Sequence, residues 1–196
     1  MKRGVSEAYF FAGFIILMSA ILSALFRDFR YWYFFGFVGT WLLSDYFASL
    51  NNYNTPLQIL KKNPRKFADL YFVTFLLGCG IQIVGQFIFR FWSYTYTNSI
   101  FGETVLILFY PFILFSFLNT YLFLKNQTKK PVVSFILSMI IGIIIWETPN
   151  LYSVSWLYSI PFVSFTIFSI NIVVLLGWSL LILLPYYVYN LVVKEK

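Results

Sequence analysis

Apolar runs about as long as a membrane-spanning helix follow one another along almost the whole chain. A bilayer core about 30 Å thick is crossed by roughly 20 residues of helix. The sequence holds about six apolar stretches near this length, at residues 8–26, 31–50, 67–89, 104–124, 132–146 and 168–189. We therefore expect an all-α fold, a polytopic transmembrane bundle of about six helices that forms a single integral membrane domain over residues 1–196.

Charged residues are too few to cover a water-facing surface. They make up 11% of the chain, and hydrophobic residues make up 60%. A soluble domain has about 25% charged residues. The composition therefore favours a protein whose surface is largely in contact with lipid, with the bilayer as its first partner.

The basic residues are divided unequally between the two sides of the predicted bundle. Eleven of the 14 Lys and Arg residues lie at the termini and in the two loops that six crossings place on the same side. The other side has Arg27, Arg30 and Arg90. Because basic loops stay on the cytoplasmic side, we expect a multi-pass cell-membrane protein with its N-terminus and C-terminus in the cytoplasm. The net charge of +7 then orients the helices and meets anionic headgroups, so no nucleic-acid partner is expected.

Two of the predicted spans leave alternatives. The first span follows Lys2 and Arg3 as the core of a signal peptide would, but it is long and Arg27 follows it directly, so we expect a retained helix. The last apolar stretch, residues 160–193, is too long for one straight crossing. Residues 160–169 are either a re-entrant or interfacial piece or part of the last helix.

Few side chains are available for chemistry. The chain has no His and a single Cys, so we expect neither a metal site nor a cofactor. Asp45 and Asp69 fall at the cytoplasmic ends of their helices, where weak interfacial ion pairs with the basic residues of 61–66 are expected. No carboxylate falls near the middle of a predicted span, which disfavours a pump or an ion-coupled transporter.

Two links on the predicted outer side resemble each other. The first, residues 85–94, contains Gln86 and ends in Trp-x-Tyr; the second, residues 146–158, contains Glu147 and also ends in Trp-x-Tyr. This pattern predicts a two-helix unit that occurs twice, with both links on one face. Alternatively, the rings form an ordinary aromatic belt at the membrane interface.

The second link resembles the lycopene cyclase domain of carotenoid-synthesising organisms, a small membrane domain with repeated helices. Glu147 followed by Trp156 and Tyr158 matches the spacing of that family, and Pro111 falls where the next helix of the family begins. The family's Pro-x-Glu-Glu motif is absent, since Phe112, Ile113 and Leu114 follow Pro111 and none of them is a carboxylate. The chain is most similar to uncharacterised prokaryotic multi-pass membrane proteins of the lycopene cyclase-like, carotenoid-biosynthesis superfamily. The resemblance implies an architecture more than an activity.

These observations lead to a functional hypothesis. We expect the chain to bind or act on an apolar isoprenoid or other lipid within the bilayer, with Glu147 as the general acid. The expected ligand-binding residues are Gln86, Trp92, Tyr94, Asn150, Trp156 and Tyr158. The alternative is a non-enzymatic structural or accessory subunit with a membrane-protein partner, or a homo-oligomer. A channel or transporter is the third option.

Overall fold

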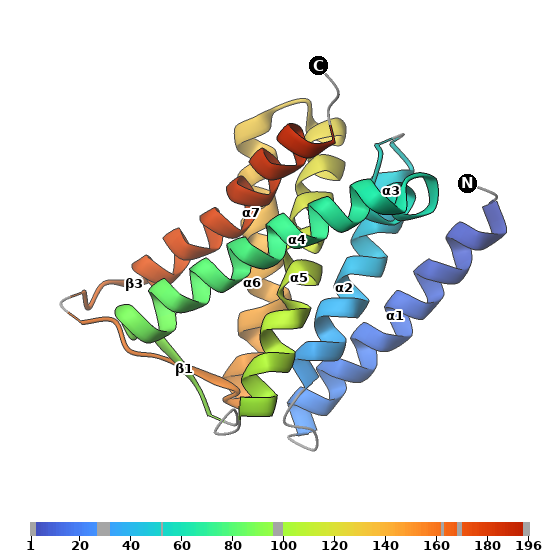
Figure 1. The fold of residues 1–196 in the computed structure, drawn as a ribbon. Helices are drawn as coiled ribbons and strands as arrows, with labels where there is room; N and C mark the ends of the chain where they lie inside the picture. The colour runs from blue at the N-terminus through green and yellow to red at the C-terminus, as the bar shows by residue number, and fades with distance from the viewer. Residues whose placement is uncertain are drawn as a thin grey trace.

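The chain folds into a bundle of long helices with two very small sheets (Figure 1). The computed structural model describes residues 3–26, 32–51, 53–95, 100–161, 163–167 and 170–193. The helices are α1 (Arg3–Phe26), α2 (Trp32–Ser49), α3 (Pro56–Lys62), α4 (Pro64–Gln82), the π-helical η1 (Ile83–Ile88), α5 (Ile100–Thr128), α6 (Pro131–Ser153) and α7 (Ile172–Val192). The strands are β1 (Trp92–Tyr94), β2 (Trp156–Tyr158), β3 (Thr166–Ile167) and β4 (Ile170–Asn171).

Within the described ranges, five helices are long and apolar enough to cross a membrane: α1, α4 with η1, α5, α6 and α7. The predicted all-α chain with several membrane-length helices is therefore confirmed. Helix α2 is not among the five, and it places Thr40, Ser44 and Asp45 inside the bundle. Crossing by α2, and with it the total of six, stays a prediction.

Helix α5 is the central element of the bundle. It packs against α2, α4, α6 and α7, and its residues Leu114, Phe115 and Leu118 are fully buried. A helix that is apolar on all sides belongs in such a position. Helix α1 lies on α2 and α6, while α4 and α7 run obliquely across the bundle on one side (Figure 1). The ends of α4 and α7 nearest β1 and β3 stand away from α5 and α6, and the candidate site lies there.

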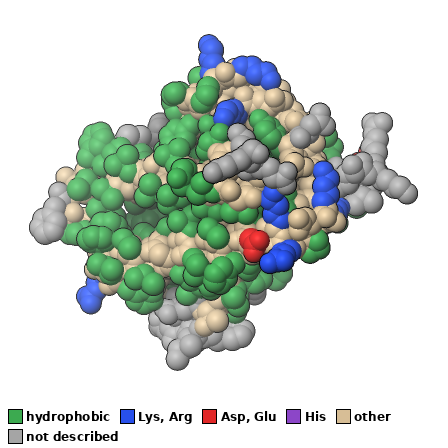
Figure 2. All heavy atoms as spheres, turned by 45° about the horizontal axis from the view of Figure 1, so that its top comes forward, with side chains coloured by type: hydrophobic (Ala, Val, Ile, Leu, Met, Phe, Trp, Pro, Cys, Tyr) green, Lys and Arg blue, Asp and Glu red, His purple; other side chains and the backbone are tan. Residues whose placement is uncertain are grey.

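Most of the basic residues of the described chain lie at one end of the bundle. Figure 1 places α3, the turn between α5 and α6, the start of α1 and the end of α7 at this end. The basic side chains are Lys61, Lys62, Arg65, Lys66, Lys125, Lys129 and Lys130. Figure 2 shows Lys and Arg side chains gathered over this end. This arrangement agrees with the charge pattern, and the side of the membrane that it faces stays a prediction.

The expectation that Asp45 lies at the interface in an ion pair is wrong, because Asp45 lies inside the bundle. Its carboxylate is 3% exposed and accepts hydrogen bonds from the Thr55 hydroxyl at 2.7 Å and the Leu57 N–H at 3.1 Å. These two donors lie at the start of α3, where the backbone N–H groups of a helix have no partner within the helix. Asp45 therefore fastens α3 to α2. Asp69 is exposed on α4.

Helix α6 extends beyond its predicted end at Trp146. It continues through Glu147, Pro149 and Asn150 to Ser153, although Pro149 removes one helical hydrogen bond. Glu147, Pro149, Asn150 and Ser153 of this last part are buried, and the Trp32 indole N–H of α2 donates to the Ser153 hydroxyl at 3.0 Å. Tertiary packing therefore outweighs the helix-breaking tendency of the proline. As a result, Glu147 lies inside a helix and not in a loop.

Helix α7 begins only at Ile172, where the Asn171 side chain caps it by accepting from the Val173 N–H at 2.9 Å. Before it, β3 and β4 form a short antiparallel pair with Thr166 opposite Asn171. The described part of residues 160–171 is therefore not an extension of the last helix. Residues 162, 168 and 169 lie outside the described residues.

Candidate functional site

The two Trp-x-Tyr links pair with each other. Strands β1 and β2 are antiparallel, with Trp92 opposite Tyr158 and Tyr94 opposite Trp156. The pairing continues on both sides, through a bond from the Ser159 N–H to the Phe91 carbonyl and one from the Thr95 N–H to the Ser155 carbonyl. The links are thus a single two-stranded element that joins the ends of η1 and α6. The sequence placed both links on one face, but it did not predict their pairing.

Glu147 lies behind the second link, on α6. Its side chain is 4% exposed, and its Oε1 atom accepts from the Tyr158 hydroxyl at 2.6 Å and from the Trp178 indole N–H at 3.1 Å. The Trp156 indole N–H in turn donates to the Tyr158 oxygen at 3.0 Å. Burial, and then the neighbouring carboxylate, raises the pKa of Tyr158 well above its usual value. The Tyr158 hydroxyl therefore stays protonated and donates a hydrogen bond to Glu147.

Gln82 holds the first link in the corresponding way. It is 1% exposed on the last turn of α4, donates to the Tyr94 hydroxyl at 3.1 Å, and accepts from the Trp92 indole N–H at 3.0 Å. Burial raises the pKa of Tyr94 to about 12, so this hydroxyl also stays protonated. Gln86, the expected residue, is half-buried in η1 and does not line the pocket described below. Gln82 takes the place that the sequence gave to Gln86.

Asn150 has a structural part in the site. Its side-chain amide donates to the Trp156 carbonyl and accepts from the Trp156 N–H, both at 3.0 Å. This pair of bonds fixes the start of β2 against the end of α6. Asn150 is also absent from the residues that line the pocket, so the structure does not place it next to a ligand there.

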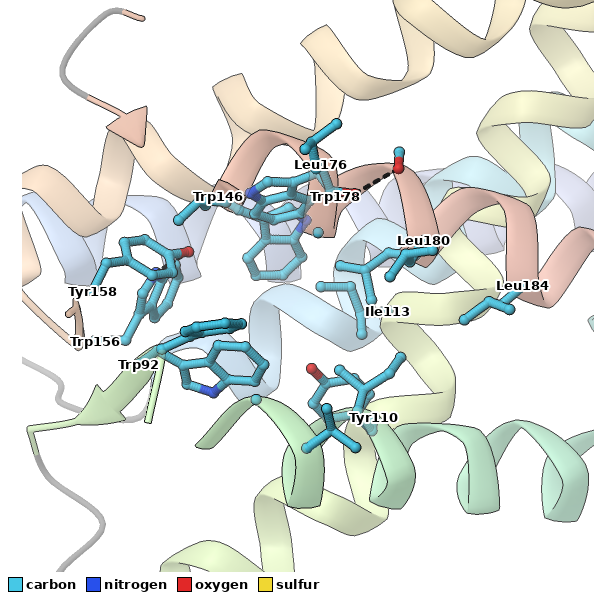
Figure 3. A pocket seen from close by; sticks show the side chains of 18 of the residues that line it. Trp92, Tyr110, Ile113, Trp146, Trp156, Tyr158, Leu176, Trp178, Leu180 and Leu184 are labelled. Carbon is cyan, nitrogen blue, oxygen red and sulfur yellow. Dashed lines mark hydrogen bonds between the residues drawn. The ribbon is translucent and has the colours of Figure 1, made fainter. Parts of the chain in front are cut away.

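The two links close one end of a large pocket between α4, α5 and α7. Its volume is about 770 Å³, and no charged side chain is among its lining residues in the described part of the chain. Figure 3 shows its aromatic residues near the links and its leucines farther along α7. The aromatic lining residues are Tyr33, Phe37, Phe91, Trp92, Tyr94, Tyr110, Trp146, Trp156, Tyr158 and Trp178. Glu147 does not line the pocket; Tyr158 and Trp178, which bind it, do.

The pocket opens sideways, between α4 and α7. Gly80 of α4 and Gly177 of α7 both line it, both are exposed, and a Cβ added to either would have no atom within 4 Å. Leu76 and Leu176 beside them are 51% and 62% exposed. Figure 2 shows a hollow on this side, ringed by hydrophobic side chains. The opening therefore faces the surface that the apolar helices present to lipid.

The sequence found about half of this site. The structure brings together Glu147, Trp92, Tyr94, Trp156 and Tyr158, as expected from the two links. It also adds residues that were not singled out, namely Gln82, Tyr110, Trp146 and Trp178. Tyr110 and Trp178 lie within long apolar helices, so no local signal in the sequence marks them.

The comparisons with known proteins give no family. No protein-family model matches the chain, and neither a curated protein nor a solved structure matches it. The resemblance to the lycopene cyclase domain therefore rests on the short motifs alone and stays a prediction. Among the residues that the structure describes, no group of His, Cys, Asp and Glu side chains is arranged to hold a metal ion.

Proposed function

We propose that this protein binds one long, apolar lipid of the isoprenoid class within the membrane, in the pocket between α4 and α7. The observation that supports this proposal is the pocket itself: about 770 Å³, lined by aromatic and aliphatic side chains, without a charged residue among them. Ligand pockets of this kind measure about 300–1,000 Å³. In this proposal the basic end of the bundle faces the cytoplasm and the two links lie near the outer surface.

The position of the opening supports a ligand that comes from the bilayer. A lipid tail is already in apolar surroundings, so moving it into an apolar pocket gains little from the hydrophobic effect. Selectivity must therefore come from contacts that lipid does not offer, above all the faces of Trp92, Trp156 and Trp178. Such faces favour a ligand with double bonds or a ring over a saturated acyl chain.

A second candidate is acid catalysis on the bound lipid. It is favoured by the 2.6 Å contact between Glu147 and Tyr158, because Tyr158 lines the pocket. In this step a protonated Glu147 would give its proton to the Tyr158 oxygen while the Tyr158 hydroxyl gives its own proton to the ligand, since the carboxyl group itself lies behind that ring. Under this hypothesis Glu147→Gln removes any conversion of the lipid but leaves its binding intact.

The binding proposal is tested by blocking the opening. The protein is purified in mild detergent, extracted with organic solvent, and its lipids are identified by mass spectrometry. We expect an isoprenoid enriched over the membrane extract in the wild type and depleted at least fivefold in Gly177→Trp, since Gly177 lines the opening and a large ring there would narrow it. The matched control is Leu183→Trp on the same helix, at a position that is 47% exposed and outside the pocket.

Equal lipid profiles in the wild type, Gly177→Trp and Leu183→Trp would overturn the binding proposal. Co-purification of a fixed membrane-protein partner in that case would favour the accessory-subunit alternative.

A further inference from the structure

Two hydroxyl groups that face the pocket have protons to donate. Tyr110 lines the pocket, its oxygen points into it in Figure 3, and none of the described residues accepts a hydrogen bond from it. The Tyr94 oxygen accepts from Gln82, and its own proton is likewise not donated to a described residue. Both rings are held in place: Tyr94 stacks on Tyr33 at 6.1 Å between centroids, and Tyr110 packs against Gly78 of α4.

Two of the hydrogen-bond acceptors beside the pocket are already occupied. The Gln82 carbonyl oxygen accepts from Trp92, and the Glu147 oxygen Oε1 accepts from Tyr158 and Trp178. The polar part of the pocket is therefore rich in donors. A buried donor without a partner costs about 1–3 kcal/mol, so a ligand that brings an acceptor is favoured over one that brings none.

The walls of the same region are indole rings. Trp92, Trp146, Trp156 and Trp178 line it, and Trp156 also stacks on Trp32 with 5.9 Å between the centroids. The faces of indole rings are electron-rich, so they attract flat rings that are electron-poor. A ring with carbonyl groups satisfies both requirements, because the carbonyls withdraw electrons from the ring and accept hydrogen bonds.

We infer that the ligand of this pocket is a neutral isoprenoid-tailed quinone, with its ring among the indoles and a carbonyl oxygen accepting from Tyr110 and Tyr94. The tail would run along Leu180 and Leu184 toward the opening beside Gly177. This inference rests on the proposed function and narrows its ligand class. It names a ligand with a carbonyl group, in place of a plain polyene hydrocarbon.

The test compares three probes on the protein in phospholipid nanodiscs. They are a benzoquinone with two isoprene units, its quinol, and squalene, each followed by its retention in the isolated nanodiscs relative to empty ones. We expect the quinone to bind at least tenfold more tightly than the quinol or squalene. Tyr110→Phe should weaken the quinone about fivefold to tenfold and leave squalene unchanged, as expected for loss of one hydrogen bond. The matched control is Tyr121→Phe, a buried tyrosine of α5 outside the pocket.

The outcomes separate this inference from the proposal on which it rests. Equal binding of quinone and squalene, equal or tighter binding of the quinol, or unchanged quinone binding in Tyr110→Phe would overturn the quinone inference while leaving lipid binding intact. If none of the three probes is retained above empty nanodiscs, both the inference and the binding proposal fail.

Discussion

The two links of the pocket share one backbone design but differ in chemistry. In each, a buried polar residue on a helix is followed by a residue in the left-handed conformation, Arg90 (φ 54°) or Val154 (φ 51°). The Trp comes two positions after this residue and the Tyr four positions after it. In the first link the polar residue is an amide, Gln82, which donates and accepts; in the second it is a carboxylate, Glu147.

The links also differ by one residue, and η1 accounts for the difference. Arg90 follows Gln82 by eight positions, whereas Val154 follows Glu147 by seven. A π-helical turn contains an additional residue compared with an α-helical turn. The extra residue is absorbed in η1, so both Trp-x-Tyr strands still meet in register. The comparison teaches that the paired strands require a fixed geometry, while the polar residue behind each can change from neutral to acidic.

The pairing of the two links can be tested by disulfide cross-linking, which either occurs or does not. Ser93 and Leu157 lie opposite each other, so cysteines at these two positions should form a disulfide on mild oxidation. The experiment uses a Cys79→Ala background and follows gel mobility before and after reduction. A control pair, Ser93→Cys with Leu191→Cys, should stay reduced, because Leu191 lies near the far end of α7. Equal cross-linking of both pairs would contradict the pairing of β1 with β2.

Gly85 has no room for a side chain, so protein stability should be sensitive to its substitution. A Cβ at this position would overlap the Trp92 ring, so Gly85→Ala must displace the ring from β1. We expect a loss of about 1–3 kcal/mol, typical of overpacking, measured by thermal unfolding in detergent. Gly80→Ala is the control, since its Cβ meets open space. Equal melting temperatures for the two variants would show that the ring does not lie on Gly85.

The same substitution at Gln82 and at Gln86 tests which of the two glutamines holds the first link. Gln82→Leu leaves the Trp92 indole N–H without its acceptor and removes the donor to Tyr94, so we expect a loss of about 1–3 kcal/mol. Gln86 is half-buried in η1, so Gln86→Leu should change the free energy of unfolding by less than about 0.5 kcal/mol. A larger loss for Gln86→Leu than for Gln82→Leu would contradict the arrangement of the first link.

The smallest expected effect is at the left-handed residue of the second link. Val154 is β-branched, and the left-handed conformation costs an L-residue about 1–2 kcal/mol. Val154→Gly removes this strain but adds chain entropy, so we expect a net gain of about 0.5–1 kcal/mol in unfolding free energy. In contrast, Val133→Gly, at an exposed helical position of α6, should lose about 0.5–1 kcal/mol. A loss at Val154 of the same size would speak against the left-handed geometry.

Apolar run length and turn residues were enough to predict several membrane-length helices, because both act locally, but they did not predict the short helix α3. The all-α fold and the basic end of the bundle follow from them directly. The end of α6 could not be predicted, since Pro149 favours a break in isolation and only its burial in the bundle allows the helix to continue. Likewise, the sequence indicates an interfacial acid at Asp45, because the local pattern does not show that α3 folds back. In the fold the Thr55 hydroxyl and the Leu57 N–H donate hydrogen bonds to this carboxylate.

The candidate site was predictable only in part for a similar reason. The Trp-x-Tyr spacing identified both links, but strand pairing depends on how α4 and α6 are placed in three dimensions. The prediction of Gln86 as a site residue assumed that the third span, residues 67–89, ends as an α-helix. The π-helical turn η1 lies there instead, and Gln82, not Gln86, binds Tyr94. Tyr110 and Trp178 lie within long apolar helices, where nothing in the local pattern distinguishes a pocket wall from the lipid-facing surface.

The most direct test of a bound lipid is an experimental structure of the protein in nanodiscs, prepared without added ligand. We predict elongated non-protein density in the pocket, with a flat end beside Trp156 and Trp178 and an atom within hydrogen-bond distance of the Tyr110 hydroxyl. A pocket filled by the protein's own side chains, or by a phospholipid tail whose headgroup lies outside, would contradict the account.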